Sequence, residues 1–319
     1  MSKNCRKEKT MFRYTTNNKR YHTLHYHLTN KFGEKVFKAV IDAGFTCPNI
    51  DGTCGIGGCA YCSDGAGEFT HGSTLSITEQ LEIERKRISR KHKDPKLIAY
   101  FQAHSNTYAP VSVLRGKYEE ALSFPDVVGL SIATRPDCID EEIAELLSEF
   151  SKKTYLTVEL GLQTANDKTA LMFNRGYSYE TFLKAYKLLK NKNVRVCVHM
   201  INGLQGECKE DMLATAKAVG ALKPDAVKIH LLHIVRGTRY AKLYELGEIE
   251  TLSKEDYIDI VCRQLEYLPQ TTVVERITGD GGRETLIAPL WSLDKISVLG
   301  GIDKEMALRE TYQGKKFNE

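Results

Sequence analysis

Four of the nine cysteines lie within sixteen residues: Cys47, Cys54, Cys59 and Cys62. Glycines lie between them, and a glycine-rich backbone is pliable enough to bring several thiolates to one centre. Thiolates are the ligands that soft metals prefer. The pattern is compatible with three kinds of site: a structural zinc with four thiolates, a four-cysteine iron–sulfur cluster, and a cluster held by three cysteines with one iron left open.

The spacing of the cysteines favours a cluster over zinc. A structural zinc site usually combines two short C-x₂₋₄-C knuckles separated by a longer loop. Cys59 and Cys62 form one such knuckle, but six residues separate Cys47 from Cys54, which makes a poor second one. An inert group of buried cysteines is disfavoured as well, because packing does not require this density of thiols.

Short apolar or β-branched runs alternate six times with amphipathic stretches of helical period. The predicted strands are Lys35–Ile41, Leu97–Phe101, Val127–Ile132, Tyr155–Leu160, Val194–Met200 and Ala226–Leu232. The predicted helices are Thr78–Lys91, Val111–Ser123, Asp140–Phe150, Tyr179–Lys190 and Lys209–Leu222, with Asp140 and Ser178 as N-caps. Repeated βα units with right-handed crossovers predict an α/β fold, a partial (β/α)₆ TIM-like barrel. Such a barrel places its chemistry at the carboxyl ends of its strands.

The alternation loosens after Leu232. Arg239–Leu246 and Lys254–Leu268 are predicted helices, Thr272–Ile277 is a predicted strand, and the polar last twenty residues are expected to form a surface tail. We therefore expect three segments. They are a basic N-terminal extension (1–34), a barrel (35–235) with the cysteine loop at 43–75, and a C-terminal extension (236–319) that completes or covers the barrel.

Composition bounds the class of protein. The chain has 319 residues, of which 42% are hydrophobic and 27% charged, as in globular proteins and unlike disordered, collagenous or coiled-coil chains. An apolar run long enough to span a bilayer and a signal-type N-terminus are both missing, which predicts a cytoplasmic protein with no membrane partner. Residues 1–40 carry ten Lys and Arg against two Glu, interleaved with aromatics. This segment suits nucleic-acid docking or, alternatively, a solubilising tail.

The cysteine segment resembles the radical S-adenosylmethionine (SAM) superfamily. The signature of this superfamily ends in C-x-aromatic-C, as in Cys59-Ala60-Tyr61-Cys62. The longer segment FTCPNIDGT…GGCAYC resembles a branch of the superfamily with C-x₁₁-C-x₂-C spacing. The resemblance implies that Cys47, Cys59 and Cys62 hold a [4Fe–4S] cluster whose open iron binds SAM. Cys54 departs from the branch pattern and stays open as an alternative ligand, because Cys54-x₄-Cys59 is near the commoner spacing.

TRPD after the third predicted strand and ELGLQ at the end of the fourth resemble motifs of the Elongator catalytic subunit and of the oxygen-independent coproporphyrinogen enzymes. The resemblance implies that Gln102 or Asn106 contacts the amino group of SAM, that Gln163 contacts a ribose hydroxyl and that Arg175 pairs with the SAM carboxylate. Glu159 and Gly203, at the ends of the fourth and fifth predicted strands, complete the expected cofactor-binding residues. The alternatives are a strand-end carboxylate for Glu159, a helix cap for Arg175 and a tight turn at Gly203.

The expected activity is reductive cleavage of SAM to a 5′-deoxyadenosyl radical, with electrons from a donor such as flavodoxin or ferredoxin. The motifs TRPD, ELGLQ and HIVRGT resemble the Elongator subunit more than peptide- or porphyrin-acting members. The expected substrate is therefore tRNA, at the C5 substituent of the wobble uridine. A small metabolite or peptide is the alternative substrate, and a zinc-containing nucleic-acid-binding protein is the alternative class.

Overall fold

The computed structural model describes residues 12–63, 70–279 and 281–317. Seven parallel strands form the central sheet, in the order β1 (Val36–Ile41), β2 (Lys96–Phe101), β3 (Val127–Thr134), β4 (Tyr155–Gln163), β5 (Arg195–Asn202), β6 (Ala226–Leu231) and β8 (Val273–Arg276). The six predicted strands and the additional strand near residue 272 are all present. The predicted partial barrel is confirmed.

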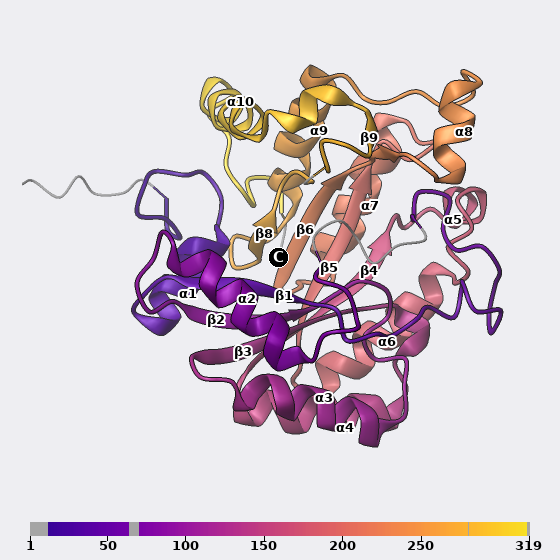
Figure 1. Cartoon of the computed structure of the whole chain (residues 1–319). Helices are drawn as coiled ribbons and strands as arrows, with labels where there is room; N and C mark the ends of the chain where they lie inside the picture. The colour runs from indigo at the N-terminus through magenta and orange to yellow at the C-terminus, as the bar shows by residue number, and fades with distance from the viewer. Residues whose placement is uncertain (1–11, 64–69, 280, 318–319) are drawn as a thin grey trace, which may run out of the picture.

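Helices connect the strands and cover the outer side of the curved sheet (Figure 1). They are α2 (Ile77–Ser89), α3 (Val111–Ser123), α4 (Glu141–Lys153), α5 (Asp167–Met172), α6 (Tyr179–Asn191) and α7 (Lys209–Ala221). The side chains of Asp140 and Ser178 cap α4 and α6, as predicted, by accepting bonds from first-turn amides. Ser76 and Glu79 form a capping box at the start of α2.

The two faces of the sheet differ in polarity. Leu130 and Ile132 in β3, like Val158 and Leu160 in β4, are buried in the main apolar core that the helices share. Because alternate strand residues point to opposite faces, Ser131 and Glu159 point to the concave face. Polar residues therefore lie inside the barrel while the apolar core lies outside it, between the sheet and the helices.

The chain after β6 adds β8 to the edge of the open sheet and several elements outside it. It forms β7 (Ile234–Val235), α8 (Arg239–Glu245), α9 (Lys254–Tyr267), β9 (Leu286–Ala288), a short 3₁₀ turn at Leu290–Leu293 and α10 (Lys295–Leu308). Another 3₁₀ turn, Pro136–Cys138, follows β3. β7 and β9 pair in a small antiparallel sheet. None of the helices in the described part of the chain has the length and apolar character needed to cross a bilayer.

The expectation of a polar surface tail over the last twenty residues is wrong for their described part. Ile302 and Met306 in α10 are fully buried, and Thr311 and Gln313 are buried beyond it. The Gln313 amide donates to the carbonyls of Pro269 (2.6 Å) and Thr272 (2.7 Å). Apolar residues four apart build this helix, and the glycines between them hid its amphipathic pattern.

The described part of the N-terminal segment packs against the barrel. The backbone carbonyl of His22 accepts a bond from the Val274 amide in β8 (2.7 Å), and α1 (Leu24–Phe32) follows. Figure 1 shows α1 on the left of the sheet and α5, which follows β4, on the right. The segment therefore lies at the amino ends of the strands, opposite the ends where a barrel of this kind places its chemistry. Cys5 lies outside the described residues.

Candidate functional site

A cavity of about 360 Å³ opens at the carboxyl ends of β3, β4 and β5. This volume falls within the range of small-ligand sites. The cavity brings together three kinds of side chain: the cysteines of the loop after β1, one guanidinium, and polar groups from the strands. Its lining includes Cys47, Cys59, Cys62, Arg135, Glu159, Gln163, Tyr177 and His199.

Asn49 holds the cysteine loop in place. Its side-chain amide donates to the Asn174 carbonyl (2.6 Å) and lies 3.8 Å from the Cys59 sulfur. The Asn174 amide donates in return to the Gly58 carbonyl (2.9 Å). A Cβ atom at residue 55 would lie 2.1 Å from the Asn49 amide oxygen, so that position requires Gly55. The Ala60 amide also donates to the Phe173 carbonyl (2.8 Å), so the loop is tied to the segment after β4 on both sides of Cys59.

The cysteines of this loop suit an iron–sulfur cluster. Cys47, Cys59 and Cys62 line one cavity, and all three thiols are unbridged. A hydrogen bond from Cys62 lowers the pKa of the Cys59 thiol to about 7, and the positive charge of Arg135 acts in the same direction. Iron binds thiolates, and a lowered pKa makes a thiolate available near neutral pH. We conclude that these residues fit a cluster held by three cysteines.

A single metal ion fits less well. Within residues 12–63, 70–279 and 281–317, no three His, Cys, Asp or Glu side chains converge closely enough to hold one ion. A structural zinc needs its ligands about one point. A four-iron cluster binds each cysteine at a different iron, so its thiolates can stay apart.

Arg135 is the guanidinium that lines the cavity. It binds the Asp137 carboxylate with two bonds, of 2.9 Å from Nε and 2.6 Å from Nη2. Nη2 also lies 3.6 Å from the Cys54 sulfur, and Nη1 donates to the Arg175 carbonyl (2.9 Å). Cys54 is exposed and does not line the cavity. The position of Cys54 outside the lining makes it a weaker candidate ligand than Cys47, Cys59 or Cys62.

Gln163 reaches the cavity from the end of β4. The Tyr177 hydroxyl lies 3.0 Å from its amide oxygen and 2.9 Å from the Gly161 carbonyl. A Cβ atom at residue 161 would lie 2.6 Å from the Gln163 amide nitrogen, so Gly161 leaves the room that this side chain occupies. The hydroxyl and the glycine together fix where the amide lies.

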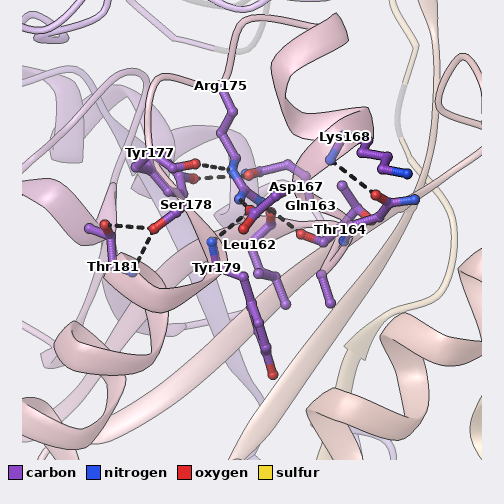
Figure 2. A network of polar contacts seen from close by, with 12 residues as sticks. Leu162, Gln163, Thr164, Asp167, Lys168, Arg175, Tyr177, Ser178, Tyr179 and Thr181 are labelled. Atoms are coloured by element: carbon purple, nitrogen blue, oxygen red, sulfur yellow. Dashed lines mark hydrogen bonds and ion pairs between the residues drawn. The ribbon is translucent and has the colours of Figure 1, made fainter.

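Arg175 lies beside the cavity and is fully buried. Figure 2 shows its guanidinium at the centre of a network. It donates to the carbonyls of Tyr177 (2.9 Å), Leu162 (2.7 Å) and Thr164 (2.6 Å) and pairs with Asp167 (2.9 Å). These bonds join the end of β4 to the start of α6. The expected contact with the SAM carboxylate stays a prediction, and the structure gives Arg175 this additional positioning role.

Glu159 is the centre of a second network, inside the barrel. Its carboxylate accepts bonds from Lys38 (2.6 Å), Ser131 (2.6 Å) and Lys228, and it lies 2.8 Å from His199 Nε2. Burial alone would raise the pKa of the Glu159 carboxyl, but Lys228, Lys38 and His199 outweigh it and hold that pKa well below its usual range. An ionised Glu159 therefore fixes His199, which faces the cavity.

The remaining predicted cofactor residues do not line this cavity. Gln102 follows β2, and its backbone amide bonds to the Ile41 carbonyl (3.0 Å). Asn106 is fully buried, and its amide donates to the carbonyls of Ala103 (2.8 Å) and Ala133 (3.0 Å). Gly203 has a φ of 88°, which suits a glycine turn after β5. Their contacts with SAM stay predictions.

Sequence reasoning missed several members of the site. Arg135 and Tyr177 lie in or beside motifs that point to other residues, while Lys38 and Lys228 lie within strand runs and belong to no motif. A lysine inside an apolar strand run, as in VFKAVI and AVKIHL, is the signal that could have found these two. A buried lysine needs a partner, and both lysines find it in Glu159.

Comparisons with known proteins identify the family of this chain. The model of the radical SAM superfamily matches residues 49–219, and the radical SAM C-terminal domain matches residues 224–307. The first match begins after Cys47, so it does not choose between Cys47 and Cys54. The chain is 50% identical over 307 residues to "Uncharacterized protein YtqA" of Bacillus subtilis, covering 96% of this chain and 95% of that protein.

Two further relatives act as points of reference. A tRNA uridine(34) acetyltransferase of Methanocaldococcus jannaschii is 31% identical over 157 residues, which cover 48% of this chain and 28% of that protein. The solved structure of Methanocaldococcus infernus Elp3 with an N-terminal deletion has a TM-score of 0.66 at 18% identity, covering 87% of this chain and 64% of that one. Family membership implies SAM and a [4Fe–4S] cluster as cofactors, in place of zinc. The chain belongs to the radical SAM superfamily of enzymes.

Proposed function

We propose that this chain is a cytoplasmic tRNA-modifying enzyme that remodels the C5 substituent of the wobble uridine, such as a carboxymethylaminomethyl group. When bound, the cluster and SAM supply a 5′-deoxyadenosyl radical that removes a hydrogen atom from an unactivated C–H bond. Flavodoxin or ferredoxin would be the electron donor. The side chains of this chain would hold the cluster and would bind and orient SAM and the substrate.

The observation that carries the proposal is the likeness to the tRNA uridine(34) acetyltransferase. It extends over 157 residues at 31% identity, well beyond a cysteine motif. The aligned part is 28% of that relative, so acetyl transfer itself is not carried over. What the proposal takes from this relative is the kind of substrate, a uridine in tRNA.

The side chains that line the cavity would have different roles in binding the cluster, SAM and the substrate. Cys47, Cys59 and Cys62 would hold the cluster, and Gln163, fixed by Tyr177, would orient SAM beside it. Arg135 supplies positive charge at the cavity wall, where the thiolates and a SAM carboxylate would both be negative. The imidazole of His199 faces the cavity from the barrel interior and would contact the substrate.

The N-terminal region supports an RNA substrate. Residues 1–40 carry ten basic and two acidic residues, and the described part places Arg13, Lys19 and Arg20 with Phe12 and Tyr14 around one surface cavity. Cations bind phosphates and aromatic rings stack on unpaired bases. A small metabolite would need neither feature.

Nucleoside mass spectrometry of total tRNA tests this function. In a strain lacking the protein, one wobble nucleoside should disappear or its precursor should accumulate. The wild-type gene should restore the profile, while a Cys59→Ala gene should not, because it removes a cluster thiolate. An unchanged nucleoside profile, together with no tRNA binding that weakens with salt in vitro, would overturn the proposal and favour a small metabolite or a peptide.

A further inference from the structure

A second cavity, of about 440 Å³, lies at the opposite end of the barrel. The end of α4, the starts of β4 and β5, and α1 surround it. We call it the cation-lined cavity and define it by six of its lining residues: His27, Lys31, Lys152, Lys153, Tyr155 and Arg195. None of these residues belongs to the site around the cysteines.

The lining carries four positive charges, from Lys31, Lys152, Lys153 and Arg195, and includes no carboxylate. In the described part of the chain, no ion pair joins an Asp or Glu to any of the four. The neighbouring Lys192 differs, since it pairs with Glu145 at 2.7 Å. Lys152 and Lys153 act on Glu145 and Glu149 only from beyond ion-pair distance, because these carboxylates pair with Lys192 and Arg115. No acidic side chain lines the cavity itself. Such a wall attracts an anion.

Buried polar atoms in the same wall have no partner among the described residues. They are Nε of Arg195 and Nε2 of His27. The other N–H groups of the Arg195 guanidinium and the ammonium groups of the three lysines are the donors of the lining. A ligand with several acceptor oxygens would bind several of these donors together.

The side chains are already arranged around a common space. The Arg195 guanidinium lies 5.6 Å from the centre of the Tyr155 ring, and Lys31 Nζ lies 5.4 Å from the same ring. The two cations approach Tyr155 from different elements, β5 and α1. Stacking on the ring restrains where both charges lie, so a ligand does not have to order two long side chains by itself.

We propose that the cation-lined cavity binds a phosphate group, and that in the cell this group belongs to the backbone of an RNA substrate. The second part rests on the proposed function. A phosphate offers acceptor oxygens and negative charge together, which match the donors and cations of the wall. Inorganic phosphate and nucleotides share this chemistry, so the choice between these sources and RNA needs its own argument.

The neighbourhood favours RNA over a small phosphate compound. The His22 ring lies 5.7 Å from His27 on one side and stacks on Tyr14 at 4.5 Å on the other. These ring contacts run through the buried His22 and join the cation-lined cavity to the surface cavity that Phe12, Arg13 and Arg20 line. A polynucleotide can place successive phosphates at two neighbouring basic cavities, and it is long enough to reach the cysteines at the other end of the barrel.

The test removes two exposed charges of the cavity and leaves its buried residues intact. We compare the Lys152→Gln/Lys153→Gln variant with the matched Lys184→Gln/Lys187→Gln variant, whose lysines are exposed on α6. The first should bind tRNA about tenfold more weakly, and the slope of log affinity against log salt should fall by about 1 for each phosphate that the variant no longer binds. The control should match wild type, and SAM cleavage without tRNA should be the same in all three proteins.

Inorganic phosphate is the second probe, followed by NMR of labelled histidines, with His27→Gln to assign the His27 signal. We expect that signal to shift only at millimolar phosphate. Tight phosphate binding combined with unchanged tRNA binding in the Lys152→Gln/Lys153→Gln variant would overturn RNA as the source. Unchanged tRNA affinity and salt slope with no His27 shift would overturn the site itself.

These outcomes are separable from those of the proposed function. If the deletion strain has a normal tRNA profile while the cavity still binds phosphate, the function fails and the phosphate site stands. If the tRNA profile changes while the double variant binds tRNA like wild type, the function stands and the phosphate site fails.

Discussion

The two ends of the barrel differ in whether their charged side chains form ion pairs. At the cysteine end, the inward-facing carboxylate Glu159 has partners in Lys38, Lys228, Ser131 and His199, and Arg135 is paired with Asp137. At the amino end, the four cations of the cation-lined cavity lack a carboxylate partner in the described part of the chain. The charged side chains named at the cysteine end form ion pairs, whereas the four cations at the amino end line a cavity that contains no carboxylate.

The difference follows from what each end has to do. A cavity that orients a reactive ligand needs side chains that already lie in one arrangement, and paired networks give that rigidity. A surface that captures a polyanion needs uncompensated charge, since its partner brings the counter-charge. Substitutions at either end of the barrel test this difference.

The largest effect is expected at the cysteines. Replacing Cys47, Cys59 or Cys62 by Ala removes a thiolate that water cannot replace as an iron ligand. Each variant should lose the reconstituted cluster and all formation of 5′-deoxyadenosine under dithionite. Iron and sulfide content, with chromatography of the products, measure both losses.

Cys54→Ala is the matched control for these variants. Its thiol is exposed and does not line the cavity, so this variant should keep both the cluster and SAM cleavage. A colourless Cys54→Ala protein beside a Cys47→Ala protein with a full cluster would contradict the assignment of ligands.

Arg175→Ala should lower the free energy of unfolding by about 3 kcal/mol, because it leaves the carbonyls of Leu162 and Thr164 without this donor and Asp167 without its ion-pair partner. Urea unfolding measures this loss. Arg175→Lys keeps the positive charge without the forked guanidinium and should lose less stability.

A SAM titration of the folded Arg175→Ala variant tests whether Arg175 also binds the SAM carboxylate. Weaker SAM binding supports that contact, and unchanged affinity leaves Arg175 with its positioning role alone.

The smallest effect is a pH dependence at the cation-lined cavity. Burial and the charges of Arg195, His22 and Lys31 lower the pKa of His27 to about 4. In the unfolded chain His27 has a pKa of about 6.5, so between these two values the unfolded state binds the extra proton. Stability should therefore fall as the pH drops from about 6.5 towards 4.

His27→Gln checks this prediction. Plots of the free energy of unfolding against pH should be less steep for His27→Gln than for wild type in that interval. Equal slopes would show that His27 is not held neutral by its neighbours. Saturating phosphate should also flatten the wild-type plot, since a bound anion favours the charged imidazole.

Local patterns predicted most of the fold and pointed to the cysteines that line the cavity. The strand runs, the caps at Asp140 and Ser178, and the pair Cys59 and Cys62 depend on residues close together in the chain. Patterns of this kind predict structure because each helix or strand forms from residues that are neighbours in the chain.

Contacts between distant segments could not be predicted in the same way. Glu159 meets Lys38, Lys228 and His199 only because the register of the parallel strands places them on one concave face. The sequence identified Arg175 as an arginine near the end of β4. It could not show that the Arg175 guanidinium donates to backbone carbonyls, or that Arg135 is the arginine that lines the cavity. α10 was missed because its buried residues are separated by glycines and polar residues.

Isotope transfer from tRNA to SAM tests the central claim most directly. Fully deuterated tRNA from a strain lacking the protein is incubated with unlabelled, reconstituted enzyme, unlabelled SAM and reductant, and the 5′-deoxyadenosine is analysed by mass spectrometry. If the enzyme removes a hydrogen atom from the wobble uridine substituent, the 5′-deoxyadenosine should contain deuterium, and this signal should vanish with tRNA from a complemented strain. Efficient SAM cleavage that yields only unlabelled 5′-deoxyadenosine would contradict a tRNA substrate.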